Sequence, residues 1–179
     1  HGRGTVKVAT GAGKTLFALA VAERLQNERE HDLRLVIVVP TIPLMHQWHD
    51  DLRKSNLPAS AIALMGGGQD TIDPDRTRIA ICVINSARDR LPRIVQDAGW
   101  AGRLLLVVDE CHRANAEESR RVFECQPRYT LGLSATPETE SEDSELPTDA
   151  AYAESPVGRA LGPIIYEYSL KRALEDGLL

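Results

Sequence analysis

Short apolar runs divide this chain into regular segments. The runs are rich in Val, Ile and Leu and are nearly continuous, which is typical of strands covered on both faces of a sheet. The first is a β-branched run near the N-terminus, and a Tyr-rich run lies near the C-terminus. We expect strands at residues 6–8, 33–39, 60–65, 78–84, 104–108, 129–133 and 164–168.

Between these runs, apolar residues recur three or four positions apart, which predicts amphipathic helices. We expect helices over residues 16–29, 43–54, 114–125 and 170–176, and a further basic helical segment with Arg88, Arg90 and Arg93. The apolar stripes of the first two consist of Phe17, Ala20, Val21 and Leu25, and of Leu44, Trp48 and Leu52. Strands that alternate with helices predict an α/β protein with a mostly parallel sheet and helices on both faces.

Polar clusters directly follow five of the predicted strands. They are Thr10 to Thr15, Pro40-Thr41, Asn85-Ser86, Asp109-Glu110 and Ser134 to Thr136. In open α/β sheets ligands bind outside the carboxyl ends of the strands. The five clusters are therefore predicted to lie along one rim of the sheet and to act as one site.

The first cluster, Thr10-Gly-Ala-Gly-Lys-Thr15, has the arrangement of a phosphate-binding loop between a strand and a helix. Gly11 and Gly13 let backbone N–H groups turn toward phosphate oxygens, and Ala12 lies between them. Lys14 can reach the outer phosphates, and the Thr15 hydroxyl is placed to bind Mg²⁺. The full pattern asks for glycine where this chain has Val8. A glycine turn without a ligand is the alternative.

The fourth cluster, Asp109-Glu110, places two carboxylates at the end of the most apolar strand. In this position Asp109 can hold Mg²⁺, and Glu110 can orient or deprotonate an attacking water. Adjacent carboxylates repel each other unless a cation or solvent relieves them. The alternative is that the pair only ends the strand and caps the next helix.

Composition and charge exclude several classes of protein. The chain has 179 residues, 42% of them apolar and 4% aromatic, which suits one domain with an aliphatic core. The net charge of −5 comes from one segment, because seven acidic residues lie between residues 138 and 154. The rest of the chain has 19 acidic and 21 basic residues. We expect a mobile acidic loop over 138–156. No run approaches a membrane span, so no membrane association is predicted.

Cysteine and histidine usage favours a reduced, cytoplasmic protein without zinc. The three cysteines are odd in number and lie in or beside apolar segments. Cys111 and His112 with Cys125, or His46 with His49, lack a fourth ligand at a suitable spacing for zinc. We therefore predict no zinc site.

Three motifs together resemble those of superfamily 2 helicases. They are Ala9-Thr-Gly-Ala-Gly-Lys-Thr15, Asp109-Glu-Cys-His112 and Ser134-Ala-Thr136, which correspond to motifs I, II and III. The Cys form of the acidic box, Val38-Val-Pro-Thr41 through Gln47-Trp48, and Ile165-Tyr-Glu-Tyr-Ser-Leu170 look most like the branch of type III restriction subunits and DNA-repair helicases. The resemblance covers essentially the whole chain.

The resemblance implies a RecA-like domain that binds ATP and Mg²⁺. It gives phosphate and metal binding to Lys14 and Thr15, metal binding to Asp109 and water activation to Glu110. His112, Ser134 and Thr136 would couple the nucleotide to the strand-binding surface. Pro40, Thr41, Asn85 and Ser86 would contact the nucleic-acid backbone, the last two by the loosest match. Thr41 and Ser86 can equally be helix N-caps. The group of Arg88, Arg90 and Arg93 can equally be a solvated face of its helix.

The resemblance also implies parts that this segment does not contain. Motors of the family have a second RecA-like domain, whose arginines complete the site, and an adenine-recognition element before motif I. Residues 1–179 are thus expected to be a single ATP-binding domain, either the first motor domain of a longer protein or an isolated remnant. Because an arginine finger is worth ~10³–10⁵ in rate, the isolated segment should hydrolyse ATP very slowly.

The predicted function is the ATP-binding half of a nucleic-acid helicase or translocase, with DNA favoured over RNA. Two alternatives stay open at this point. The protein can be an ATP-gated nucleic-acid clamp that does not unwind. It can also be a P-loop kinase of small molecules, although that function leaves the Ser134-Ala-Thr136 motif unused.

Overall fold

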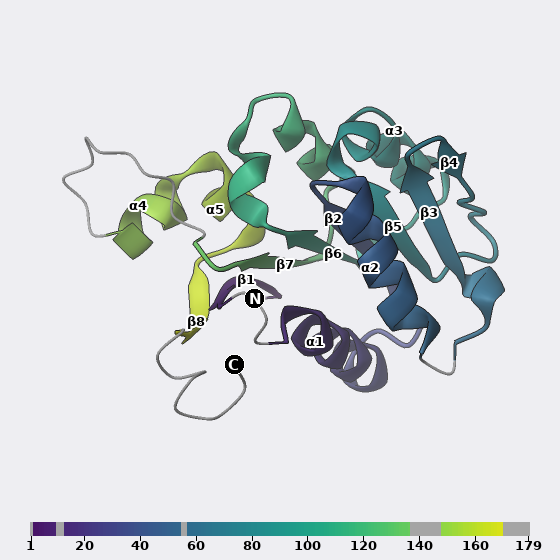
Figure 1. Ribbon diagram of the computed structural model, residues 1–179, viewed down its shortest axis with the longest axis horizontal. Helices are drawn as coiled ribbons and strands as arrows, with labels where there is room; N and C mark the ends of the chain where they lie inside the picture. The colour runs from purple at the N-terminus through teal and green to yellow at the C-terminus, as the bar shows by residue number, and fades with distance from the viewer. Residues whose placement is uncertain (1, 10–12, 55–56, 137–147, 170–179) are drawn as a thin grey trace.

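In the part of the chain that the structure describes, eight strands form a single central sheet (Figure 1). The computed structural model describes residues 2–9, 13–54, 57–136 and 148–169. The strands are β1 (Arg3–Val8), β2 (Arg34–Val39), β3 (Ile62–Gly66), β4 (Gln69–Asp70), β5 (Ile79–Val83), β6 (Leu104–Asp109), β7 (Tyr129–Ser134) and β8 (Ile164–Tyr168). Their order is β4-β3-β5-β2-β6-β7-β1-β8, and only the pairing of β3 with β4 is antiparallel.

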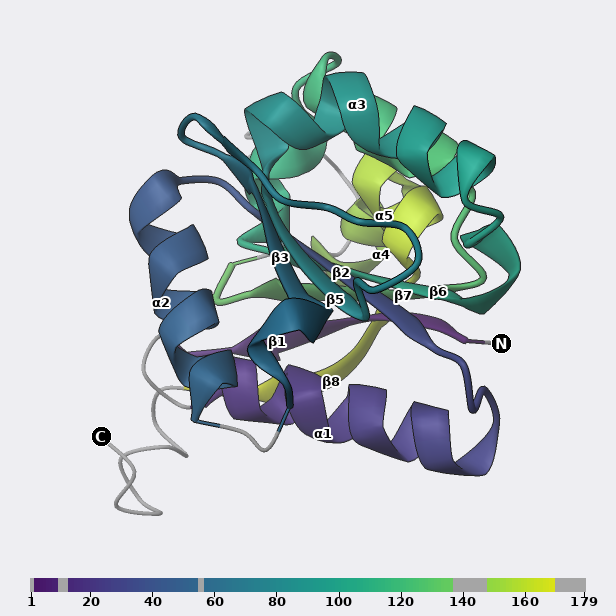
Figure 2. The same ribbon diagram turned by 90° about the vertical axis from the view of Figure 1, so that its right-hand side faces the viewer.

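Helices cover both faces of this sheet, as predicted. Helices α1 (Lys14–Glu28) and α2 (Ile42–Arg53) pack on one face, and α3 (Ile84–Asp97), α4 (Thr148–Glu154) and α5 (Pro156–Leu161) lie on the other (Figure 2). Short 3₁₀ helices are η1 (Ala59–Ala61), η2 (Ala101–Arg103), η3 (Cys111–Asn115) and η4 (Ser119–Cys125). None of the described helices has the length and apolar character needed to cross a membrane.

Two hydrophobic cores result from the alternation of side chains along the strands. Every residue of β2, β5, β6 and β7 is buried, because neighbouring side chains point to opposite, covered faces. Along β2, Leu35 and Ile37 join the core beneath α1 and α2, whereas Val36 and Val38 join the core beneath α3. The α/β fold and the mostly parallel sheet predicted from the sequence are therefore confirmed.

The apolar stripe of α1 differs from the predicted one. Ala18 and Ala22 are the buried residues of this helix, and Ala20, which the prediction placed on the stripe, is exposed. The other predicted stripe residues, Phe17, Val21 and Leu25, are partly buried and pack against the core on this face. In α2, Trp48 and Leu52 are buried as predicted, together with Met45.

The predicted helix over 114–125 is wrong. The chain forms the two 3₁₀ helices η3 and η4 instead, separated by residues 116–118. Ser119, Val122 and Cys125 are buried and lie three residues apart. This spacing matches the three residues per turn of a 3₁₀ helix rather than the 3.6 of an α-helix.

The predicted mobile loop over 138–156 is wrong in its C-terminal part. Helix α4 occupies Thr148–Glu154, and α5 begins at Pro156 after Ser155, whose side chain accepts a hydrogen bond from the Gly158 N–H at 3.0 Å. Tyr152 anchors α4 because its buried ring belongs to the core beneath α3. Residues 138–147 of this stretch, and the helix predicted over 170–176, lie outside the described residues.

Candidate nucleotide site

Five adjacent parallel strands bring the polar clusters to one rim of the sheet. Strands β5, β2, β6, β7 and β1 are neighbours in this order and run in the same direction. Their carboxyl ends therefore lie side by side, as the sequence predicted. Chain segments more than 100 residues apart meet there, because the P-loop follows β1 and the Ser134 motif follows β7.

Lys14 opens helix α1 at this rim. The preceding residue, Gly13, has φ of +86°, a left-handed conformation that favours glycine and serves here as the helix N-cap. The Lys14 Nζ lies 2.5 Å from Glu110 Oε1 and 3.9 Å from Asp109 Oδ1. The lysine thus supplies the cation that relieves the repulsion between the two carboxylates. Thr10, Gly11 and Ala12 lie outside the described residues.

Asp109 is buried at the end of β6, with 6% of its surface exposed. Its Oδ2 accepts a hydrogen bond of 2.8 Å from the Trp48 indole Nε1, and its Oδ1 accepts one of 2.9 Å from the Glu110 backbone N–H. Burial raises the pKa of the Asp109 carboxyl, whereas the bond from Trp48 and the charge of Lys14 act in the opposite direction. The carboxylate is therefore costly to bury and is held by several donors.

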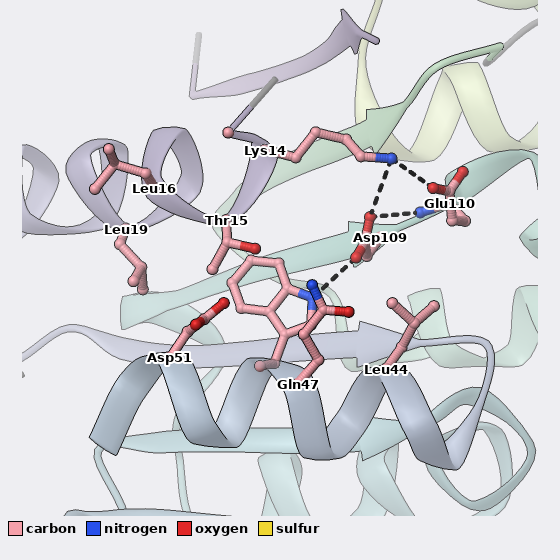
Figure 3. A pocket seen from close by; sticks show the side chains of 11 residues that line it. Lys14, Thr15, Leu16, Leu19, Leu44, Gln47, Asp51, Asp109 and Glu110 are labelled. Carbon is pink, nitrogen blue, oxygen red and sulfur yellow. Dashed lines mark hydrogen bonds and ion pairs between the residues drawn. The ribbon is translucent and has the colours of Figure 1, made fainter. Parts of the chain in front are cut away.

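Glu110 has an unusual backbone for a residue with a side chain. Its φ and ψ are 48° and 51°, in the left-handed region. Such a conformation costs on the order of 1–3 kcal/mol and is concentrated at functional sites. At this residue the chain leaves β6 and enters η3, with the Glu110 carboxylate beside Lys14 and its N–H on Asp109 (Figure 3).

A cavity of about 500 Å³ opens beside these three residues. Helix α1 contributes Lys14, Thr15, Leu16 and Leu19, and α2 contributes Leu44, Gln47, Trp48 and Asp51 (Figure 3). The Thr15 side chain lies on the first turn of α1 and lines the same cavity as Asp109. A hydroxyl and carboxylates are the oxygen ligands that Mg²⁺ prefers. The residues present therefore fit a Mg²⁺-bound phosphate.

His112, Ser134 and Thr136 form a polar connection from β6 to β7. The His112 Nδ1 lies 3.0 Å from the Ser134 Oγ, and the same Oγ accepts the Thr136 N–H at 3.1 Å. The His112 Nδ1 also lies 3.6 Å from Glu110 Oε2. The structure thus brings all three predicted coupling residues together and joins them to the carboxylate pair.

Pro40 and Thr41 lie at the carboxyl end of β2, and Thr41 is the N-cap of α2. Its Oγ1 accepts the Leu44 N–H at 3.5 Å, so the capping role predicted for Thr41 is confirmed. The matching prediction for Ser86 is wrong. Helix α3 begins at Ile84, directly after β5, and its N-cap is Val83, whose apolar side chain cannot form a capping hydrogen bond.

Asn85 and Ser86 therefore lie within the first turn of α3, and Asn85 is exposed. Neither these two residues nor Pro40 and Thr41 line the cavity beside Lys14. They occupy neighbouring positions along the rim.

The basic residues of α3 are paired with acids. Arg88 lies 2.7 Å from Glu118, Arg93 lies 3.5 Å from Asp97, and Arg90 contacts Asp70. This pairing agrees with the interpretation of the group as a solvated, charged face.

All three cysteines are buried free thiols. Burial raises the pKa of Cys111 and of Cys125 to about 12, and that of Cys82 as well. These side chains are thiols at neutral pH and serve as small core residues. Among the described residues, no group of His, Cys, Asp or Glu side chains could hold a metal through three or more ligands.

The contact between Trp48 and Asp109 escaped the sequence analysis. Trp48 was predicted as a core residue of α2, which it is, but its polar partner was not. A buried indole N–H needs an acceptor, and α2 begins directly after a strand that ends at the rim. Those two facts are the only sequence signal for this contact.

The fold and the site together define the class of protein. A parallel sheet that carries Lys14 at a helix start and Asp109-Glu110 at a central strand end is a RecA-like P-loop domain. The crystal structure of the Pyrococcus furiosus Hef helicase domain has the same fold, with a TM-score of 0.67. It is 24% identical, and the match covers 93% of this chain and 35% of that one.

The family model of the type III restriction enzyme res subunit matches residues 1–139. The chain belongs to this family, ResIII. A curated relative, the "Putative DNA 3'-5' helicase Rad25" of Halobacterium salinarum, is 31% identical over 134 residues, which is 74% of this chain and 20% of the relative. The "DNA 3'-5' translocase XPB2" of Sulfurisphaera tokodaii is 30% identical over 170 residues, 94% of this chain and 33% of the relative.

A viral relative carries a different name. The "Putative ATP-dependent RNA helicase QP509L" of African swine fever virus is 28% identical over 141 residues, 76% of this chain and 25% of that protein. The chain therefore spans about a fifth to a third of the length of these curated relatives.

Proposed function

We propose that this chain is the ATP-binding half of an ATP-dependent helicase or translocase that moves on nucleic acid. The observation that carries the proposal is the convergence of Lys14, Asp109 and Glu110 beside one cavity, although Lys14 and Glu110 lie 96 positions apart in the sequence. Names of the relatives described above agree with this function. Domain arrangement, residue roles and partners are part of the proposal.

Lys14 and the N-terminus of α1 bind the phosphates of ATP, together with Thr10, Gly11, Ala12 and Gly13. Thr15 and Asp109 would hold Mg²⁺, which would supply positive charge against the phosphate oxygens. Glu110 accepts the proton of the attacking water, and it is free to do so once Lys14 has moved from its carboxylate to a phosphate.

His112, Ser134 and Thr136 relay the state of the nucleotide to the nucleic-acid surface. Their hydrogen bonds join the Glu110 end of β6 to the end of β7. Pro40, Thr41, Asn85 and Ser86 contact the sugar–phosphate backbone along the rim, without reading sequence. Closure of two RecA-like domains over ATP, followed by release after hydrolysis, moves the protein stepwise along the strand.

The working motor includes a second RecA-like domain in the natural protein. The short coverage of the relatives supports this proposal, since each is at least three times as long as its matched part. Residues 1–179 alone then lack the arginines that complete the site and hydrolyse ATP very slowly. DNA is the proposed strand, because the relatives of higher identity are named for DNA. The buried thiols agree with a cytoplasmic location.

Three assays on the natural protein that carries this chain test the function: ATP hydrolysis, strand displacement and phosphate transfer to small molecules. ATP hydrolysis is measured with and without single-stranded DNA or RNA of equal length, and strand displacement is measured on a tailed duplex. The proposal predicts hydrolysis that DNA stimulates more than RNA, and movement along DNA. ATP binding with no movement would identify a clamp instead, and phosphate transfer to a small molecule would identify a kinase. A Lys14→Ala variant distinguishes each activity from contamination.

A further inference from the structure

Trp48 is directed at the carboxylate to which the proposed function assigns Mg²⁺. Its side chain is 1% exposed, and its indole Nε1 donates a hydrogen bond of 2.8 Å to Asp109 Oδ2, from 61 positions earlier in the chain. A buried indole N–H needs an acceptor, but core packing alone does not require that acceptor to be a carboxylate. Here the acceptor is Asp109, the only buried acidic side chain among the described residues.

The two oxygens of Asp109 have separate partners. Oδ2 is engaged by Trp48, whereas Oδ1 accepts the Glu110 N–H at 2.9 Å and lies 3.9 Å from the Lys14 Nζ. Donors on both oxygens fix the rotation of the carboxylate. Oδ1 is thereby kept on the side of Lys14, at the cavity that Thr15 also lines.

We propose that Trp48 is a positioning residue for the metal site: its indole N–H holds Asp109 so that Oδ1 is presented to Mg²⁺. This inference rests on the proposed function. Residues that orient a metal ligand typically affect metal affinity or activity about ten- to a hundredfold when removed. Trp48 acts from α2, so it also joins the helix after Pro40-Thr41 to the carboxylate at the end of β6.

The test separates metal binding from phosphate binding. Affinity for a fluorescent ADP analogue is measured over a range of Mg²⁺ concentrations and in EDTA, for the wild-type protein, Trp48→Phe and Trp100→Phe. The control is matched, because Trp100 is also 1% exposed but lies in the core on the other face, beneath Arg34. For Trp48→Phe we expect the Mg²⁺ concentration that gives half of the effect on ADP affinity to rise about ten- to a hundredfold, with a smaller change in the affinity measured in EDTA. Trp100→Phe should leave both unchanged.

A second measurement follows the indole signals in the ¹H–¹⁵N spectrum of the natural protein. Residues 1–179 contain two tryptophans, and the signals that disappear in Trp48→Phe and in Trp100→Phe are those of Trp48 and Trp100. The Trp48 signal should shift when Mg²⁺ is added to the ADP complex and in Asp109→Asn, whereas the Trp100 signal should stay in place.

The inference would be overturned if a folded Trp48→Phe protein depended on Mg²⁺ as the wild type does. It would also be overturned if the Trp48 signal shifted neither on addition of Mg²⁺ nor in Asp109→Asn. These results would leave the nucleotide site intact. Loss of the proposed function looks different: the wild-type protein itself would then show no Mg²⁺-dependent ADP binding.

Discussion

The Lys14 Nζ lies 2.5 Å from Glu110 Oε1, so the P-loop lysine and the proposed general base form an ion pair. Asp109 Oδ1, at 3.9 Å, shares the same cation. In the proposed function, a phosphate competes with these carboxylates for Lys14. Glu110 is then available to the attacking water.

Glu110→Gln is expected to separate binding from turnover. The variant keeps the shape of the side chain but removes its charge, so Lys14 loses a competing partner. Nucleotide affinity should stay equal or rise, whereas hydrolysis should fall by about 10²–10⁴-fold because the base is gone. Equilibrium binding of ADP and steady-state hydrolysis in the natural protein measure the two effects.

Glu118→Gln is the matched control for this variant. Glu118 is exposed and paired with Arg88, away from the cavity. Normal hydrolysis in Glu110→Gln would show that another group activates the water.

Tyr152 joins α4 to β1, and Tyr152→Phe is expected to weaken this contact. The Thr5 Oγ1 donates to the Gly162 carbonyl at 3.1 Å and so accepts its 2.7 Å hydrogen bond from the Tyr152 hydroxyl. The same hydroxyl also lies 3.9 Å from the Cys111 Sγ, so its loss should reduce the free energy of unfolding by at least about 0.5–1.5 kcal/mol. Urea denaturation measures this change. Tyr166→Phe, at a ring that is 44% exposed, should change stability by less than about 0.5 kcal/mol.

Asp32 is expected to make stability depend on pH. It contacts Arg34, Arg78 and Arg103, and its hydrogen bond from Arg78 is the main cause that lowers its pKa below 3.8. A lowered pKa stabilises the folded protein above the unfolded value, and the stabilisation disappears as pH falls through the folded value. Asp32→Asn should therefore destabilise the protein at pH 7, and the difference should narrow below about pH 4.

At pH 7 we expect Asp32→Asn to lower the free energy of unfolding by about 1–2 kcal/mol. Arg34, whose side chain is 7% exposed, loses its carboxylate partner, but Asp32 itself is 42% exposed and its charge is screened by water. Asp97→Asn, in an exposed pair with Arg93, is the control and should change stability less. A difference that persists unchanged to pH 3 would contradict this account.

The sequence was sufficient to predict the features that depend on burial and chain direction. Continuous apolar runs such as Leu104–Val108 are typical of strands covered on both sides, and parallel strands place their carboxyl ends on one edge. The meeting of Lys14 with Asp109 followed from those two facts. The rest of the rim was predicted from the polar clusters that directly follow the other strands.

Features that depend on how helices rotate and pack were missed. An alanine-rich stripe does not distinguish Ala18 and Ala22 from Ala20, because all three fit an apolar face. The period of three at Ser119, Val122 and Cys125 becomes visible only through burial. Likewise, the partner of Trp48 depends on the angle at which α2 crosses the sheet, which no local pattern encodes.

Nucleotide binding by Lys14→Ala tests the central claim most directly. Titration of the natural protein with a fluorescent ADP analogue in the presence of Mg²⁺ should give saturable binding, and Lys14→Ala should weaken it at least about a hundredfold, since charge-assisted bonds to phosphate contribute about 1.5–3 kcal/mol each. Lys7→Ala, on the strand before the loop and paired with Glu167, should bind as the wild type does. Equal affinity in Lys14→Ala and wild type would contradict the account.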